Sequence, residues 1–150
     1  MQSLIGLAAI GAFCWAQCAQ PATATSSDQP SRSVREGVYT AQQAKRGEAI
    51  YARECASCHG ATLQEGEAPP LAGAEFLAEW YGYSAGDLLE RMRQTMPPTG
   101  PGKMSGQEYV DILAHILGIN KFPTGNTELE SRTGLLKQIR IEAAKPRPKL

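Results

Sequence analysis

Two cysteines and a histidine near the middle of the chain are the residues whose types and spacing could do chemistry. They lie in the stretch Cys55-Ala56-Ser57-Cys58-His59. Thiol and imidazole groups at this spacing suit three kinds of chemistry: a zinc site, a thiol–disulfide exchange pair, or covalent attachment of a haem. The residues around the motif decide which of the three is favoured.

The sequence offers too few ligands for a zinc site. A structural zinc site needs four protein ligands, and a catalytic site needs three with a water molecule. The motif offers at most three ligands, and His115, the other histidine, lies in the apolar stripe of a predicted helix. Cys14 and Cys18 belong to a segment that we expect to be removed. The sequence therefore disfavours zinc.

Thiol–disulfide exchange is disfavoured by the setting of the two cysteines. Such motifs are usually found beside a βαβ pattern, and a thiol of low pKa prefers a helix N-terminus. Here the pair stands at the end of a helical pattern, among other helical patterns.

The C-x-x-C-H spacing is typical of c-type haem attachment. One helical turn separates Cys55 from Cys58, so each thiol can form a thioether to one of the two haem vinyl groups. The neutral Nε2 of His59, the next residue, can then coordinate the iron. The sequence predicts one haem c, bound covalently through Cys55 and Cys58, with His59 as an iron ligand.

A methionine is the expected second iron ligand, because His/Met coordination raises the reduction potential and suits electron transfer. Met92 shares a predicted helix face with Leu88, which favours core packing. Met104 precedes a helix start and could fill a gap. Met96 is followed by two prolines that stop a helix, and such a stiff loop can present a sulfur inward. Met96 is therefore the predicted ligand.

The elements that position these residues are predicted to be helices. Ser105 with Glu108 has the pattern of a capping box, as does Thr40 with Gln43, and apolar residues then recur at spacings of three and four. Gly- and Pro-rich loops separate the helical patterns, and no β-hairpin is indicated. The sequence predicts an all-α domain with helices near residues 40–60, 75–81, 84–96 and 105–118.

The two ends of the chain differ from this domain. The apolar segment Leu4–Ala16 is too short to span a hydrocarbon core of about 30 Å, but it suits the apolar region of a secretory signal. Ala22-Thr23-Ala24 offers a cleavage site, although residues 1–3 lack a basic side chain. We predict a signal peptide at 1–24 and periplasmic export, with an uncleaved membrane anchor as the alternative.

Beyond the signal, residues 25–37 are predicted to be a disordered leader and residues 38–122 the domain. Residues 123–150 are a partly irregular extension, in which 135–141 suits a short strand or an added helix. Lys+Arg and Asp+Glu are both 15, so a nucleic-acid partner is not expected.

Three stretches carry a resemblance to a known family: TAQQAKRGEAIYARECASCHG, APPLAG, and RQTMPPTGPGKMSGQEYVDILAHILGIN. Over residues 38–122 the chain resembles a class I cytochrome c. It is most similar to the haem c subunits that accompany quinoprotein alcohol dehydrogenases. The resemblance implies three to five helices around one haem, with crossing first and last helices.

The resemblance also implies roles for individual residues. Met96 would be the distal iron ligand, and the Pro69 carbonyl would accept the proton of the His59 imidazole. Leu71 would pack on the haem, and Trp80 would lie near the haem propionates. At the helix crossing, Gly47, Tyr51 and Ile112 match the family, whereas His115 stands where an aromatic residue is expected.

The predicted function is that of a one-electron carrier and not an enzyme. It would act between a periplasmic dehydrogenase or respiratory complex and a terminal oxidase or other cytochrome. One alternative is a five-coordinate haem that senses gas or acts on peroxide. Another is a fixed haem subunit of a quinoprotein dehydrogenase. Membrane contact is expected only if the N-terminal segment stays uncleaved.

Overall fold

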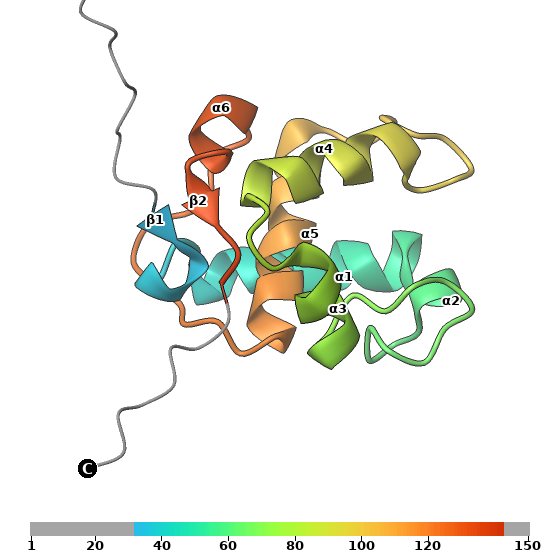
Figure 1. Cartoon of the computed structure of the whole chain (residues 1–150). Helices are drawn as coiled ribbons and strands as arrows, with labels where there is room; N and C mark the ends of the chain where they lie inside the picture. Colours follow the sequence, from blue (N-terminus) through green and yellow to red (C-terminus); the bar gives the residue numbers. More distant parts are fainter. Residues whose placement is uncertain (1–31, 143–150) are drawn as a thin grey trace, which may run out of the picture.

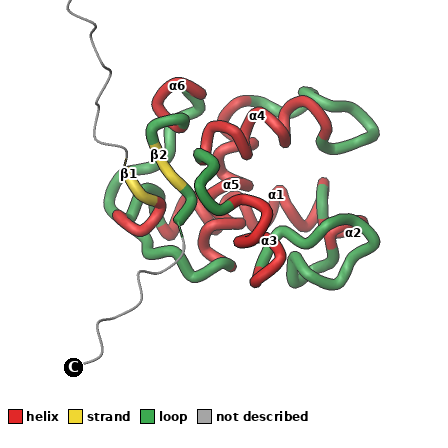
Figure 2. Tube along the Cα trace, in the orientation of Figure 1, coloured by secondary structure: helices red, strands yellow, loops and turns green. Residues whose placement is uncertain are grey.

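A computed structural model of the protein describes residues 32–142, so the predicted signal at 1–24 lies outside the described residues. Figure 1 and Figure 2 show a mainly helical fold with one very small sheet. Five of the helices fall within 38–122, in line with the predicted three to five. In chain order the elements are β1 (Arg32–Ser33), the 3-10 helix η1 (Val34–Glu36), α1 (Ala41–Glu54), α2 (Ala56–His59), α3 (Gly73–Trp80), α4 (Ala85–Thr95), α5 (Gly106–Ile119), α6 (Thr133–Leu136) and β2 (Ile139–Arg140).

The crossing of α1 and α5 is the centre of the fold (Figure 1). The two helices meet at Gly47, where an added Cβ would lie 1.8 Å from the backbone oxygen of Asp111. Only glycine allows the two backbones to come so close. Beside this point the ring centroids of Tyr51 and His115 are 5.3 Å apart, and Ile112 is buried. The predicted crossing is confirmed, and His115 occupies the aromatic position in it.

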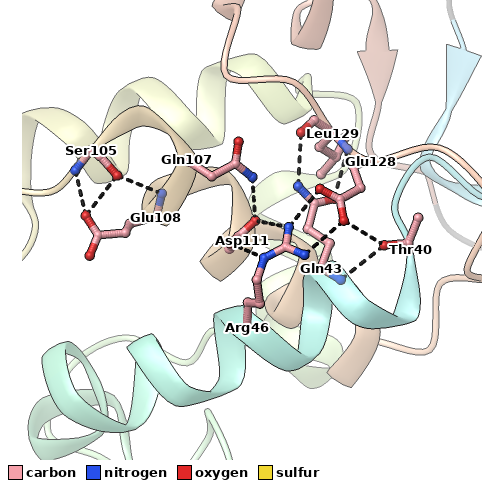
Figure 3. Close-up of polar contacts among 9 residues, drawn as sticks. All are labelled: Thr40, Gln43, Arg46, Ser105, Gln107, Glu108, Asp111, Glu128 and Leu129. Carbon is pink, nitrogen blue, oxygen red and sulfur yellow. Dashed lines mark hydrogen bonds and ion pairs between the residues drawn. The ribbon is translucent and has the colours of Figure 1, made fainter.

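Both predicted helix caps are present, but only the one at Ser105 forms the full reciprocal capping box. Ser105 and Glu108 form a reciprocal capping box at α5 (Figure 3), and Ser84 does the same with Asp87 at α4. At α1 the Thr40 side chain accepts a hydrogen bond from the Gln43 backbone, but Gln43 does not return it. The Gln43 amide instead exchanges two hydrogen bonds with the backbone of Leu129, at 3.0 and 2.8 Å.

The first helix is not continuous over 40–60, as the sequence predicted. It ends at Glu54, and Cys55 has φ −125°, outside the helical region. The backbone N–H groups of Cys58 and His59 then both bond to the Cys55 carbonyl, which starts the separate turn α2. The break therefore falls within the cysteine motif.

The two ends of the described chain pack onto each other. β1 pairs in parallel with β2, and Val34 in η1 is fully buried. The prediction of a disordered leader is thus wrong for residues 32–37, because their partner lies in the extension, more than a hundred residues away. The 135–141 segment contains the end of α6 and all of β2, and its Leu136, Ile139 and Ile141 are buried.

A polar network joins α1, α5 and the extension (Figure 3). The guanidinium of Arg46 bonds both oxygens of the buried Asp111 carboxylate, at 2.9 and 3.1 Å, and reaches Glu128 at 2.7 Å. Gln107 donates a further bond to Asp111 at 2.7 Å. These hydrogen bonds, first to Glu128 and then to Asp111, raise the pKa of Arg46. Such a satisfied network fixes the position of the elements that share it.

Between residues 32 and 142, no helix has both the length and the apolar character that crossing a membrane requires.

Candidate cofactor site

A cavity of about 720 Å³ lies among α1, α2, α3, α4 and α5. This volume is within the usual range for sites that enclose a small molecule or cofactor. All seven residues that the sequence analysis assigned to a cofactor line this one cavity, namely Cys55, Cys58, His59, Pro69, Leu71, Trp80 and Met96. Residues up to 41 positions apart are therefore brought together by the fold.

The two cysteines of the motif face the same cavity from different surroundings. Both are free thiols; Cys55 is partly buried and Cys58 is exposed. Burial, with a smaller contribution from the Glu54 charge, raises the pKa of the Cys55 thiol to about 11. A thiol that stays protonated at neutral pH is a poor nucleophile for disulfide exchange, in line with the sequence, which disfavours that chemistry.

His59 is held in one orientation by a single backbone group. The residue is 7% exposed, and Nδ1 of its ring lies 2.9 Å from the carbonyl oxygen of Pro69. In the tautomer that donates from Nδ1, the lone pair is on Nε2, the nitrogen suited to bind a metal. The contact that the resemblance implied between His59 and Pro69 is present.

The loop that carries Pro69 is tied to α2 and α5. The Ala68 N–H donates to the Cys58 carbonyl at 3.0 Å. Asn120, at the end of α5, donates to the Leu71 carbonyl at 2.9 Å and accepts from the Gly73 N–H at 3.0 Å. Sequence reasoning missed Asn120, because nothing in its surroundings along the chain points to a partner some fifty residues earlier.

Leu63, a buried residue of the same loop, fixes the loop at a second point. Leu63 is fully buried although its φ is +66°, in the left-handed region, and its carbonyl accepts from the Leu71 N–H at 2.8 Å. Tyr51 of α1 adds a bond from its hydroxyl to the Gly60 carbonyl at 2.8 Å. The loop is thus fixed at its start, middle and end.

Two methionines line the cavity from α4 and the residue that follows it. Met96 is the C-cap of α4, and its N–H still bonds to the Met92 carbonyl at 2.8 Å before the prolines begin. Met92 is 8% exposed and also lines the cavity, so its predicted place on the buried helix face is confirmed. Met104 is half-buried and packs against the core.

The remaining wall carries aromatic and charged side chains. The Trp80 and Tyr83 rings meet edge to face with centroids 5.8 Å apart, and both line the cavity. Arg91 of α4, together with Glu75 and Glu79 of α3, adds charged groups to the lining. Arg91 could not be identified from the sequence, because one arginine on a helix gives no signal by itself.

The donor set of the cavity fits a covalently held haem. It combines two thiols, an imidazole with one nitrogen engaged by a carbonyl, and thioether sulfur from methionine, among mostly apolar neighbours. These groups correspond to the attachment and axial ligands of c-type haem. Residues 32–142 contain no group of three or more His, Cys, Asp and Glu side chains that could hold a metal ion by themselves.

Comparison with known families gives one match. Residues 42–116 match the family described as cytochrome c oxidase, cbb3-type, subunit III. The matched range begins in α1, ends in α5 and includes all seven predicted site residues. No curated protein and no solved structure gives a significant match.

Proposed function

Because the chain belongs to the cytochrome c family described as cbb3-type cytochrome c oxidase subunit III, we propose that it is an exported monohaem carrier of single electrons. It has the all-α class I cytochrome c fold, and the family supports a haem-based electron carrier. The observation that carries the proposal is that every residue predicted to hold the haem lines the same cavity.

Each of these residues has a proposed part in holding the cofactor. Cys55 and Cys58 would attach it by thioether bonds, and His59 and Met96 would bind its iron. The Pro69 carbonyl orients the His59 ring and makes Nε2 more basic. Leu71 supplies apolar packing, and the Trp80 N–H donates to a propionate. When bound, the haem supplies one-electron redox chemistry at its iron.

Two iron ligands from the protein would favour electron transfer over catalysis. With His59 and Met96 both bound to the iron, no position would be left for a gas or peroxide. The protein's own task is then to keep the two ligands in place and exclude water from the cavity. The cavity lining, mostly apolar and enclosed by five helices, suits that task.

The proposed partners are redox proteins on the exported side of a membrane. A dehydrogenase, such as a quinoprotein dehydrogenase, or a respiratory complex would supply the electron, and a terminal oxidase or another cytochrome would accept it. The equal numbers of acidic and basic residues favour weak, transient encounters, because electrostatic steering is then small.

A second candidate function is that of a fixed haem subunit in an oxidase complex. The family description, which names an oxidase subunit, favours this candidate. Purification under mild conditions distinguishes the free carrier from the fixed subunit. A carrier should elute as a single small protein, and a fixed subunit should elute with a large partner that remains bound at moderate salt.

Iron coordination is tested by absorption spectra of the protein produced with a cytochrome c maturation system. We expect the ferric wild type to show the weak red-edge band of sulfur bound to iron. Met96→Ala should lose this band, whereas Met92→Leu, the matched control in the same cavity, should keep it. A wild type without the band that binds carbon monoxide readily when reduced would instead favour the five-coordinate sensor or enzyme.

Covalent attachment is tested by replacing both thiols. Cys55→Ser with Cys58→Ser should abolish covalent haem, so that acid–acetone extraction removes all colour from the protein. Colour that stays with the double variant after extraction would contradict the assigned attachment sites.

A further inference from the structure

We propose that Tyr109 is a positioning residue that holds the Met96 ligand loop closed through its hydroxyl group. The proposal rests on the proposed function, since it takes Met96 as an iron ligand. Tyr109 is not a lining residue of the cavity and would act on the ligand only through the backbone.

The Tyr109 hydroxyl uses both of its hydrogen-bonding roles on the loop that follows α4. It donates to the Met96 carbonyl oxygen at 2.8 Å and accepts from the Gly102 N–H at 3.0 Å. One oxygen atom therefore joins the first residue of the 96–102 loop to its last. The side chain comes from α5, which also crosses α1 at the centre of the fold.

The ring that carries this hydroxyl is itself fixed. Tyr109 is 1% exposed, and the Arg93 guanidinium lies over its ring at 5.9 Å from the centroid. Arg93 is held in turn by the backbone carbonyl of Ser131 in the extension, at 3.2 Å. A buried ring on a long helix gives the loop a rigid point of attachment.

The loop has few other means of holding its shape. Pro97 and Pro98 have no N–H to donate. Within the loop, Gly100 N–H donates to the Pro97 carbonyl at 2.9 Å, which closes one turn but does not join the loop to a helix. In this proposal Met96 leaves the iron when the 96–102 loop opens, and opening the loop breaks both bonds to Tyr109.

Removal of the hydroxyl should therefore favour the open loop. In the open loop the Met96 carbonyl and the Gly102 N–H bond to water, so the hydroxyl contributes only to the closed state. A net contribution of the usual size for one or two hydrogen bonds corresponds to about a tenfold change in the open–closed equilibrium.

The experiment measures imidazole binding to the ferric protein with its haem attached, since imidazole competes with Met96 for the iron. Tyr109→Phe keeps the ring and removes the hydroxyl. We expect it to bind imidazole about tenfold more tightly than the wild type. It should also lose the sulfur-to-iron band at a lower denaturant concentration than that at which the helices unfold.

Tyr39→Phe is the matched control. Tyr39 is also 1% exposed, and its hydroxyl donates to the Phe122 carbonyl at 2.6 Å, in a part of the fold that does not line the cavity. Its loss should lower global stability without changing imidazole affinity. If Tyr109 has only a structural role, Tyr109→Phe should behave like this control. That result would overturn the proposal.

If Tyr109→Phe does not fold, hydrogen exchange of the wild-type protein tests the proposal. The Gly102 amide should exchange slowly with solvent hydrogen and lose this protection when imidazole displaces Met96. The Gly125 amide, which bonds to the Tyr39 carbonyl at 2.7 Å, should stay protected and serves as reference. Unchanged protection of Gly102 would refute the coupling.

The failure of this proposal can be told apart from the failure of the proposed function. A wild type without the sulfur-to-iron band would show that Met96 is not the ligand, and both would fall. A wild type that has the band, with imidazole affinity unchanged in Tyr109→Phe, would overturn the positioning role alone.

Discussion

The two walls that carry His59 and Met96, the proposed iron ligands, are built differently. The His59 wall, residues 55–72, is tied to α1 by the Tyr51 hydroxyl and to α5 by Asn120, and bonds from Ala68 to Cys58 and from Leu71 to Leu63 cross-link it internally. The Met96 wall, residues 96–103, is joined to the helices through the Met96 N–H, which bonds to the Met92 carbonyl, through the Tyr109 hydroxyl, and through Lys103, whose ammonium pairs with Glu54 at 2.8 Å. The chain around the imidazole is thus cross-linked as well as anchored from two helices, while the loop after the thioether is closed mainly by one hydroxyl.

This contrast indicates where ligand exchange should start. A wall with several independent anchors opens only when most of them break together, as in global unfolding. A loop with few anchors can open by itself at a lower free-energy cost. We therefore expect events on the Met96 side to change the spectrum before the fold is lost, and events on the His59 side to change stability first.

The largest expected effect of the three that follow comes from breaking the His59 wall at Asn120. Asn120→Ala removes its bonds to Leu71, Gly73 and Ile116 and should lower the free energy of unfolding by about 3 kcal/mol. Denaturant unfolding of the protein with haem attached measures this. The exposed Asn126, replaced by alanine, is the control and should change little. A small effect at Asn120 would mean that the wall is held mainly by its other anchors.

A smaller effect is expected in the pH dependence of folding stability. It involves His115, which packs on Tyr51 behind the His59 wall. Burial lowers the pKa of His115, against a weaker opposing effect of the Glu48 charge. The unfolded chain therefore binds a proton more readily than the folded protein, so stability is full above about pH 6.5 and declines as pH falls below it.

His115→Phe should remove that decline. Unfolding free energies of the wild type and the variant, measured from neutral pH downward, should differ by an amount that changes with pH below about 6.5. A difference that stays constant over the whole range would show that His115 does not titrate differently on folding.

The smallest effect is expected on the Met96 wall at Lys103. Its side chain is 46% exposed, and exposed ion pairs contribute little to stability. Lys103→Ala should leave the unfolding free energy nearly unchanged and raise imidazole affinity only slightly, an effect that added salt removes. Lys45→Ala, which breaks the exposed pair with Glu48, is the control. A change as large as that of Tyr109→Phe would place the main anchor at Lys103.

The haem motif and the helix starts could be predicted because their signals are local. The Cys55–His59 spacing is one helical turn, and the Ser105 cap needs only residues three positions away. The prolines after Met96 end a helix wherever they stand. These features depend on bond geometry within a few residues, so the sequence alone determines them.

The anchors of the two walls could not be predicted in this way. In the sequence, Tyr109 is one residue within the predicted helix near 105–118, and Asn120 lies two positions beyond that helix. Their partners, Met96 and Leu71, are 13 and 49 positions away. The same holds for Val34 and β1, which fold because the extension supplies β2.

By itself, then, the sequence determined which atoms can bind a haem and where the helices around them begin. The tertiary structure alone decided which side chains hold those atoms in place. The physical reason is that a hydrogen bond between distant segments depends on how the helices pack. That packing was set at the Gly47 crossing, where α5 places Tyr109 on one wall and Asn120 on the other.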